Sequence, residues 1–218
     1  LNKISVKNNF DTVKQSLGNV ARRELPRILT QFCRDPNNEA YGCVDRYWWH
    51  YKIRDFPSII LQQAALTIHT ASQLNNEDSD KFDNLINASI TFWNRRAIKY
   101  GAFEEYYPWE KGYPPLAFST LAMIILIKER SLNPSLFREG FSKAADQLKK
   151  RFENEAANQQ IAGLAALAHI KNLFPELVSM SEFEELTKKS LALQNNEGWF
   201  YEYGGPDLGY LSVTIDCL

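Results

Sequence analysis

A repeated loop-and-helix unit constrains this chain more than any other feature of its sequence. The segment that opens at Gly101 reads GAFEEYYPWEKGYPPLAF, and the one that opens at Gly198 reads GWFYEYGGPDLGYLSVTI. Aligned without gaps, they share Gly, Phe, Glu-Tyr and Gly-Tyr at equivalent positions. A more distant copy opens at Gly42 with GCVDRYWWHYKIRDFPSII. Each copy is an aromatic, acidic loop that runs into an apolar helix, and such repetition indicates a helical repeat architecture.

Apolar residues at steps of three and four predict seven helices and the start of an eighth. The expected ranges are 10–33, 57–74, 80–97, 114–130, 134–152, 157–173 and 181–193, with the last helix starting near Tyr210. Ser79 or Asp80 is the expected cap of the third helix, and Ser181 that of the seventh. No segment reads as a strand.

Two kinds of helix alternate along the chain. The first, third, fifth and seventh have one apolar stripe and one polar face, as expected for helices with a solvent-exposed side. The others are apolar around most of their circumference, as in IAGLAALAHI, which is typical of helices covered on most sides. We therefore expect an all-α fold. Its predicted form is an α/α toroid, or incomplete barrel, of antiparallel helical hairpins in a single domain over residues 1–218.

This alternation places every long loop between an outer and an inner helix. All inner helices then run parallel, and the loops 34–56, 98–113, 153–157 and 194–209 collect on one rim. Helix N-termini point at this rim with unpaired N–H groups, and loops on a rigid scaffold commonly carry function. Because residues 210–218 form an apolar run without a helix stop, we expect that the chain is truncated at this end.

Composition argues against several classes of partner. The formal net charge is -1, which gives no case for nucleic acid. The longest apolar run, residues 121–127, is too short to cross a membrane. The three cysteines lack the spacing of a zinc site. We expect no metal, no cofactor, no nucleic-acid partner and no membrane insertion, while the compartment and the oligomeric state stay open.

The first loop concentrates aromatic and cationic side chains. Trp48 and Trp49 offer flat faces on which sugar rings can stack. His50 can act as an acid or a base near neutral pH, and Arg46 and Arg54 can hold a carboxylate. The alternative is that the tryptophans close the end of the helical layer and that His50 has a structural role.

The second and third loops combine carboxylates with aromatic rings. Such pairs suit glycoside hydrolysis, in which one acid protonates the leaving oxygen and the other attacks or activates water. Glu105-Tyr106 and Glu202-Tyr203 recur, however, so these residues can equally serve the packing of each repeat. The candidate substrate-binding residues are Arg46, Tyr47, Trp48, Trp49, Arg54, Glu104, Glu105, Tyr106, Trp109, Gln159, Glu202, Tyr203, Asp207 and Tyr210.

These motifs resemble the α/α-toroid polysaccharide lyases, first the helical domain of the heparinase II/III-like group and then the alginate-lyase-like toroids. The resemblance rests on DRYWWHYKIRDFP, GAFEEYYPWEKGY, ANQQIAG and EGWFYEYGGPDLGY, and it covers residues 10–218. In these lyases an Asn neutralises the uronate carboxylate while a Tyr or His moves the proton. The resemblance implies Asn158 as neutraliser, with His50 or Tyr107 as base or acid. Asn158 can equally cap its helix.

Three functions follow as hypotheses. The first is a lyase that acts on a uronate-containing oligo- or polysaccharide by β-elimination. The second is a glycoside hydrolase that uses a carboxylate pair, and the third is a non-catalytic glycan-binding or scaffolding toroid. Two features depart from the lyase pattern: only four hairpins are present, and the sheet domain that completes a heparinase-like site is absent. The acidic second and third loops also favour a neutral substrate over a polyanion.

Overall fold

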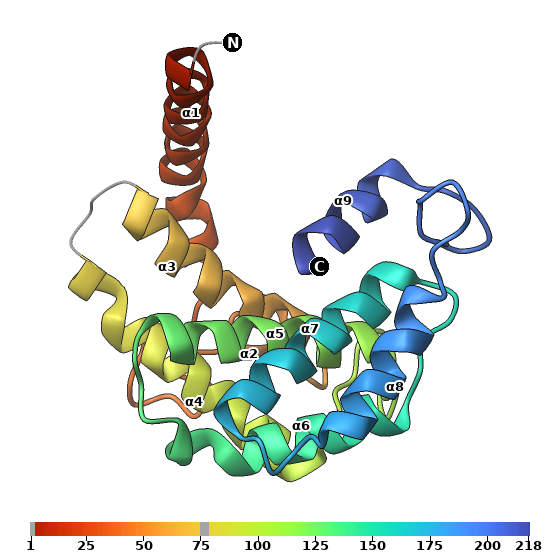
Figure 1. Cartoon of the computed structure of the whole chain (residues 1–218). Coiled ribbons are helices and arrows are strands. Elements are labelled where there is room, and N and C mark those ends of the chain that lie inside the picture. The colour runs from red at the N-terminus through yellow and green to blue at the C-terminus, as the bar shows by residue number, and fades with distance from the viewer. Residues whose placement is uncertain (1–2, 75–78) are drawn as a thin grey trace.

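The structure, a computed structural model, describes residues 3–74 and 79–218, with the side chains of residues 3–10 and 79–80 left out of the description. Within these residues the chain forms nine α-helices and no strand, which confirms the predicted all-α class (Figure 1). The helices are α1 Lys3–Leu29, α2 Arg46–Trp49, α3 Ala64–Leu74, α4 Asp83–Tyr100, α5 Tyr113–Glu129, α6 Arg138–Lys150, α7 Ala157–Leu173, α8 Met180–Leu191 and α9 Leu208–Cys217. Short 3₁₀ segments precede α3, α4 and α6: Ile59–Gln63, Ser79–Phe82 and Pro134–Phe137.

The helices pack in two rows. The segment Ile59–Gln63 packs against α5, α5 against α7, and α7 against α9, which forms an inner row. On the outer side, α4 packs against α6. The core lies between the rows, because α5 and α7 bury apolar side chains around most of their circumference. This arrangement agrees with the predicted alternation of exposed and covered helices.

The inner helices run in one direction. In Figure 1, α3, α5, α7 and α9 all point their N-terminal ends to the right of the view, and the second and third loops lie on that side. One isolated β-bridge, between Ala156 and Glu202, joins the third loop to the segment before α7. The second and third loops therefore follow the prediction. The first loop departs from it, because Pro36, Asn38 and Tyr41 lie against α4.

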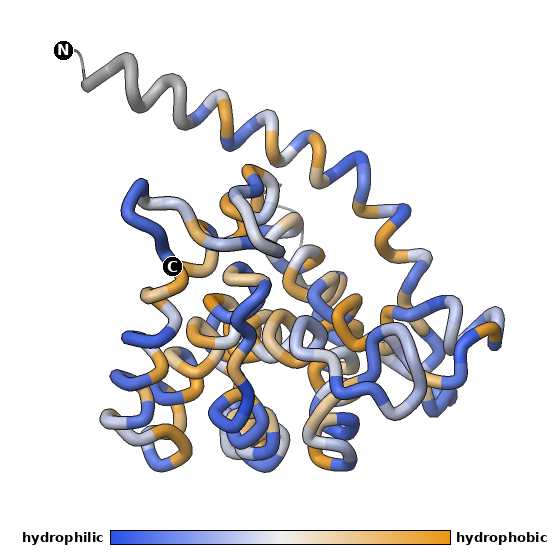
Figure 2. Tube along the Cα trace, turned by 90° about the vertical axis from the view of Figure 1, so that its right-hand side faces the viewer, coloured by the Kyte–Doolittle hydropathy of each residue, from blue (hydrophilic) through white to orange (hydrophobic). Residues whose placement is uncertain are grey.

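An aromatic cluster fills the centre of the core. The Trp93 ring of α4 lies 4.9 Å from the Phe141 ring of α6 and 6.2 Å from the Phe103 ring. Its indole N–H donates to the Ser119 hydroxyl of α5 at 2.9 Å, which satisfies the polar atom of a fully buried side chain. This cluster joins the two rows. The polar residues lie mainly on the outside of the packed helices (Figure 2).

Helix α1 is only partly packed. Leu25 is buried and Ile28 half-buried against the core, whereas Val13 and Leu17 are exposed. The reason is visible in Figures 1 and 2, where the first part of α1 stands apart from the other helices.

Several helix boundaries differ from the prediction. Helix α8 begins after Ser179, whose hydroxyl and backbone form a capping box with Glu182, so the prediction of Ser181 as the cap is wrong. The short helix α2 is not foreseen, and it forms because the buried Asp45 carboxylate accepts the Tyr47 N–H at 3.1 Å. Helix α4 begins after Phe82, so the prediction of Ser79 or Asp80 as its cap is wrong, and the side chains of these two residues lie outside the described ones.

Candidate functional site

The candidate site is the loop rim, which we define as the second loop, residues 101–112, the third loop, residues 192–207, and the start of α7. The second loop is closed by a bridge between Phe103 and Gly112. The third loop is bridged to the start of α7 through Ala156 and Glu202, and the Ala157 N–H donates to the Tyr201 carbonyl at 3.1 Å. The third loop thus rests on the inner helix that precedes it in sequence.

The Glu202 carboxylate is bound at the start of α7. One oxygen accepts the backbone N–H of Asn158 at 2.7 Å, and the other accepts its side-chain amide at 2.6 Å. Both residues are buried. Burial raises the pKa of Glu202, while the two hydrogen bonds from Asn158 act in the opposite direction. The Asn158 amide proposed as a uronate neutraliser is therefore directed at a carboxylate of the protein itself. Asn158 is not the cap of α7, because the N-cap position is Ala156.

At the starts of two further helical segments, carboxylates of the protein also accept backbone N–H groups. The Ser58 N–H, at the start of the 3₁₀ segment before α3, donates to Asp45 at 2.8 Å. The Tyr210 N–H, in the first turn of α9, donates to Asp207 at 2.9 Å. Carboxylates at these ends offset the positive helix dipoles. The helix N-termini of the rim are therefore a weaker attraction for an anionic ligand than the sequence alone suggests.

The carboxylates of the second loop differ in environment. Glu110 accepts the backbone N–H groups of Tyr106 at 2.7 Å and Tyr107 at 3.1 Å, and these bonds lower its pKa. Glu105 is half-buried, and its pKa is raised first by burial and then by the nearby charge of Glu110. Glu104 is also half-buried. Glu110 therefore shapes the loop, and the pKa of Glu105 is shifted in the direction that favours its protonated form.

Exposed aromatic rings are the most evident feature of the rim. Five of the predicted residues show large exposed fractions: Tyr106 75%, Tyr107 70%, Trp109 87%, Tyr203 60% and Tyr210 43%. The Tyr203 and Tyr210 rings lie 5.8 Å apart, and the Tyr203 hydroxyl accepts the Gln159 amide at 3.0 Å. The exposure of so many aromatic rings to water is energetically unfavourable, and such a patch commonly marks a binding surface.

The pKa of Tyr106 is raised mainly by the Glu105 carboxylate, and Tyr210, in the first turn of α9, contributes to the same rise.

The first loop uses its aromatic residues differently. Trp48 and Trp49 are half-buried and pack on the core, and the Trp49 indole N–H donates to the Gln31 carbonyl at 2.7 Å. The guanidinium of Arg46 lies 5.0 Å from the Tyr51 ring centre. These contacts support the structural alternative for the two tryptophans.

The other first-loop candidates are exposed. The guanidinium of Arg54 lies 5.8 Å from the Tyr47 ring centre and 3.5 Å from Asp45. His50 is exposed and lies between the rings of its neighbours in sequence. In the described part of the chain, no hydrogen bond or ring contact joins His50 to Tyr107 or Asn158.

Sequence reasoning missed Trp199 and Tyr201, whose rings meet edge to face at 4.9 Å in the third loop. Their membership of the repeated motif was the signal that could have identified them.

No arrangement of three or more His, Cys, Asp or Glu side chains suited to a metal ion occurs among the described residues. Over the same residues, every helix is too short or too polar to span a bilayer. Comparisons with protein families, with curated proteins and with solved structures give no match for this chain. The functional argument therefore rests on the geometry of the rim.

Proposed function

We propose that the loop rim binds a neutral oligosaccharide through the exposed aromatic rings of its second and third loops and of the first turn of α9. The observation that carries the proposal is the set of five exposed rings at one end of the inner helices. Aromatic faces stack on the C–H groups of sugar rings, and the phenol hydroxyls beside them can bond to sugar hydroxyls. The Gln159 amide, fixed on Tyr203, adds a polar group at the same place.

A neutral ligand is favoured by the charge of the rim. The sequences of the second and third loops hold six carboxylates and one lysine, Lys111. The helix ends nearby already carry the protein's own carboxylates, Glu202 and Asp207. A polyuronate would therefore meet net repulsion, and a lyase mechanism that needs Asn158 would first have to break its bonds to Glu202.

The two-row packing of the helices is compatible with an arc of an α/α toroid. The toroid form and the single-domain organisation are part of this proposal. The resemblance to polysaccharide lyases is proposed for the helical scaffold alone, because the charge of the rim argues against a uronate substrate.

The binding test uses neutral and uronate oligosaccharides of equal length in isothermal titration calorimetry. We expect the neutral ligands to bind and Trp109→Ala and Tyr203→Ala to weaken them by about tenfold each, the loss that corresponds to about 1.4 kcal/mol. Leu136→Ala, which removes an exposed apolar side chain far from the rim in sequence, is the matched control and should bind normally. Tighter binding of uronates, or no binding by any ligand, would contradict the proposal.

Glycoside hydrolysis is a second candidate, and the raised pKa of the half-buried Glu105 favours it. A proton donor must stay protonated near the working pH, and burial has this effect on a carboxyl group. Mass spectrometry of the products would decide the class of reaction, because hydrolysis adds one water and elimination leaves an unsaturated end. Glu105→Gln should abolish hydrolysis and leave binding intact, whereas unchanged turnover would exclude this role.

A further inference from the structure

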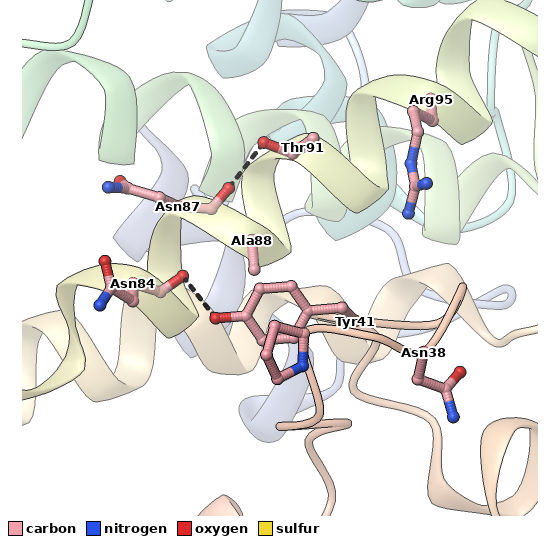
Figure 3. A pocket seen from close by; sticks show the side chains of 8 residues that line it. Asn38, Tyr41, Asn84, Asn87, Ala88, Thr91 and Arg95 are labelled. Carbon is pink, nitrogen blue, oxygen red and sulfur yellow. Dashed lines mark hydrogen bonds between the residues drawn. The ribbon is translucent and has the colours of Figure 1, made fainter.

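A groove lies on the surface of α4, away from the second and third loops. It encloses a volume of about 400 Å³ (Figure 3). One wall comes from the segment between α1 and α2, and the other from one face of α4. The lining residues are Pro36, Asn38, Tyr41, Asn84, Asn87, Ala88, Thr91 and Arg95. We call this feature the amide groove, because three of its polar residues are asparagines.

The walls of the amide groove are fixed to each other. Gly42 adopts φ +86°, and a Cβ atom at this position would overlap the backbone of Ala88. The Gly42 carbonyl accepts the Ser89 hydroxyl at 2.8 Å and the Gln62 amide at 3.0 Å. The Tyr41 hydroxyl reaches the Asn84 carbonyl at 3.5 Å. The segment before α2 therefore sits directly on α4, and the groove is preformed.

The Tyr41 and Thr91 hydroxyls of the amide groove bond to backbone carbonyls of α4, whereas some of its other polar groups make no hydrogen bond to the described part of the chain. Among the described residues, the side-chain amides of Asn84 and Asn87 have no hydrogen-bond partner. Arg95 donates one N–H to the Glu39 carbonyl at 3.1 Å, which leaves further donors of its guanidinium available. Each amide offers both donors and an acceptor, as does the peptide group.

The spacing of these groups fits an extended chain. Asn87 and Arg95 are eight residues apart on α4, which places them about 12 Å apart along its axis, close to two repeats of an extended chain. An extended peptide presents its N–H and C=O groups on one side at intervals of about 6.6 Å. Figure 3 shows Asn84 and Asn87 toward one end of the groove, with Arg95 toward the other.

A sugar ligand fits this groove less well than it fits the rim. Tyr41 is half-buried, and it packs against the core. The groove therefore lacks the freely exposed aromatic faces that the rim offers for stacking.

We propose that the amide groove binds an extended peptide segment of a partner protein. Asn84 and Asn87 hydrogen-bond to its main chain, and Arg95 pairs with an acidic side chain at one end. Recognition of the backbone by amide side chains gives affinity, and the single cation gives a preference for an acidic residue.

The test follows the side-chain signals of Asn84, Asn87 and Arg95 in ¹⁵N-correlated NMR spectra of the full chain. The probe is a blocked pentapeptide, acetyl-Ser-Ala-Ser-Ala-Glu-amide, titrated to millimolar concentrations. We expect saturable shifts of these signals. Replacing the Glu of the probe by Lys should weaken binding by about tenfold, and methylating its backbone nitrogens should have a similar effect. Asn87→Ala and Arg95→Met should lose the shifts, while Asn172→Ala, an exposed amide elsewhere, should keep them.

Three results would overturn the proposal. The first is the absence of saturable shifts with the pentapeptide, and the second is equal binding of the methylated probe. The third is a neutral pentasaccharide that shifts the same signals while the peptide does not. The dispersion of the amide signals in the same spectra shows whether each variant is folded.

Discussion

Glu202 places both of its carboxylate oxygens on one residue, Asn158, which lies 44 positions away in sequence. One oxygen satisfies a backbone N–H that the first turn of α7 leaves without a helical partner. The other fixes the asparagine side chain. The pair therefore ties the third loop to the start of an inner helix.

Removing either member of this pair should destabilise the fold. We expect Glu202→Ala to lower the free energy of unfolding by about 3 kcal/mol, because buried hydrogen bonds to charged groups contribute about 1.5–3 kcal/mol each. With Asn158→Ala, a double-mutant cycle in urea should give a coupling energy above about 1 kcal/mol. Glu197→Ala, at an exposed loop position, should cost far less. A coupling energy near zero would show that the two side chains act independently. Loss of activity in Asn158→Ala alone would not identify a catalytic residue.

Two glycines allow the cost of backbone strain to be measured separately from the cost of a steric clash. Gly42 and Gly204 have almost the same dihedral angle, φ +86° and +90°, but only at Gly42 would a Cβ atom meet backbone. We expect Gly204→Ala to cost about 1 kcal/mol, which is the strain of the left-handed region. Gly42→Ala should cost about 3 kcal/mol or more, since Ala88 cannot move without shifting α4. Chemical denaturation of the two variants measures the difference, and equal costs would mean that the loop yields instead.

The stability should depend on pH through His169. Its Nδ1 atom lies 3.2 Å from the Lys128 ammonium, and burial, followed by this charge, lowers its pKa below 6.5. The unfolded chain therefore takes up a proton at a higher pH than the folded chain does. Stability is fully present above pH 6.5 and falls as the pH is lowered through that value. Thermal unfolding between pH 8 and 5 should show this fall. Lys128→Met should reduce it, and a slope that does not change in this variant would contradict the assignment.

Asp45 should matter more than the arginine beside it. The Asp45 carboxylate is fully buried and accepts the N–H groups of Tyr47 and Ser58, whereas Arg54 reaches it at 3.5 Å from a partly exposed position. We expect Asp45→Ala to cost about 3 kcal/mol, because it leaves the buried Ser58 N–H and the part-buried Tyr47 N–H unpaired. Arg54→Ala should cost less than about 1 kcal/mol. Similar losses in the two variants, measured in urea, would show that the ion pair dominates.

The sequence predicts the long helices well, because burial imposes a period on them. The range 157–173 matches α7 at both ends, where an apolar run begins after a polar loop and stops before Pro175. The residue that caps a helix is harder to predict. Ser179 and Ser181 are each followed by a glutamate three residues later, Glu182 and Glu184, so the capping-box pattern fits both, and the structure uses Ser179 with Glu182.

The candidate site is predictable only in part. The repeat identifies the loops, and the alternation of helix types brings the second and third of them to one rim. The bond between Asn158 and Glu202 joins residues of two different motifs, so no local pattern indicates it. The amide groove likewise depends on Gly42, which brings a loop onto a distant face of α4.

The attachment of the third loop to α7 has a consequence for protein engineering. Its contacts at Tyr201, Glu202 and Tyr203 are made with residues 155–158, in the hairpin before it. A transplanted loop 192–207 would therefore keep its shape only if the recipient supplied that helix start as well. The unit of exchange in this scaffold is a loop together with the preceding inner helix, rather than the loop and the helix that it leads into.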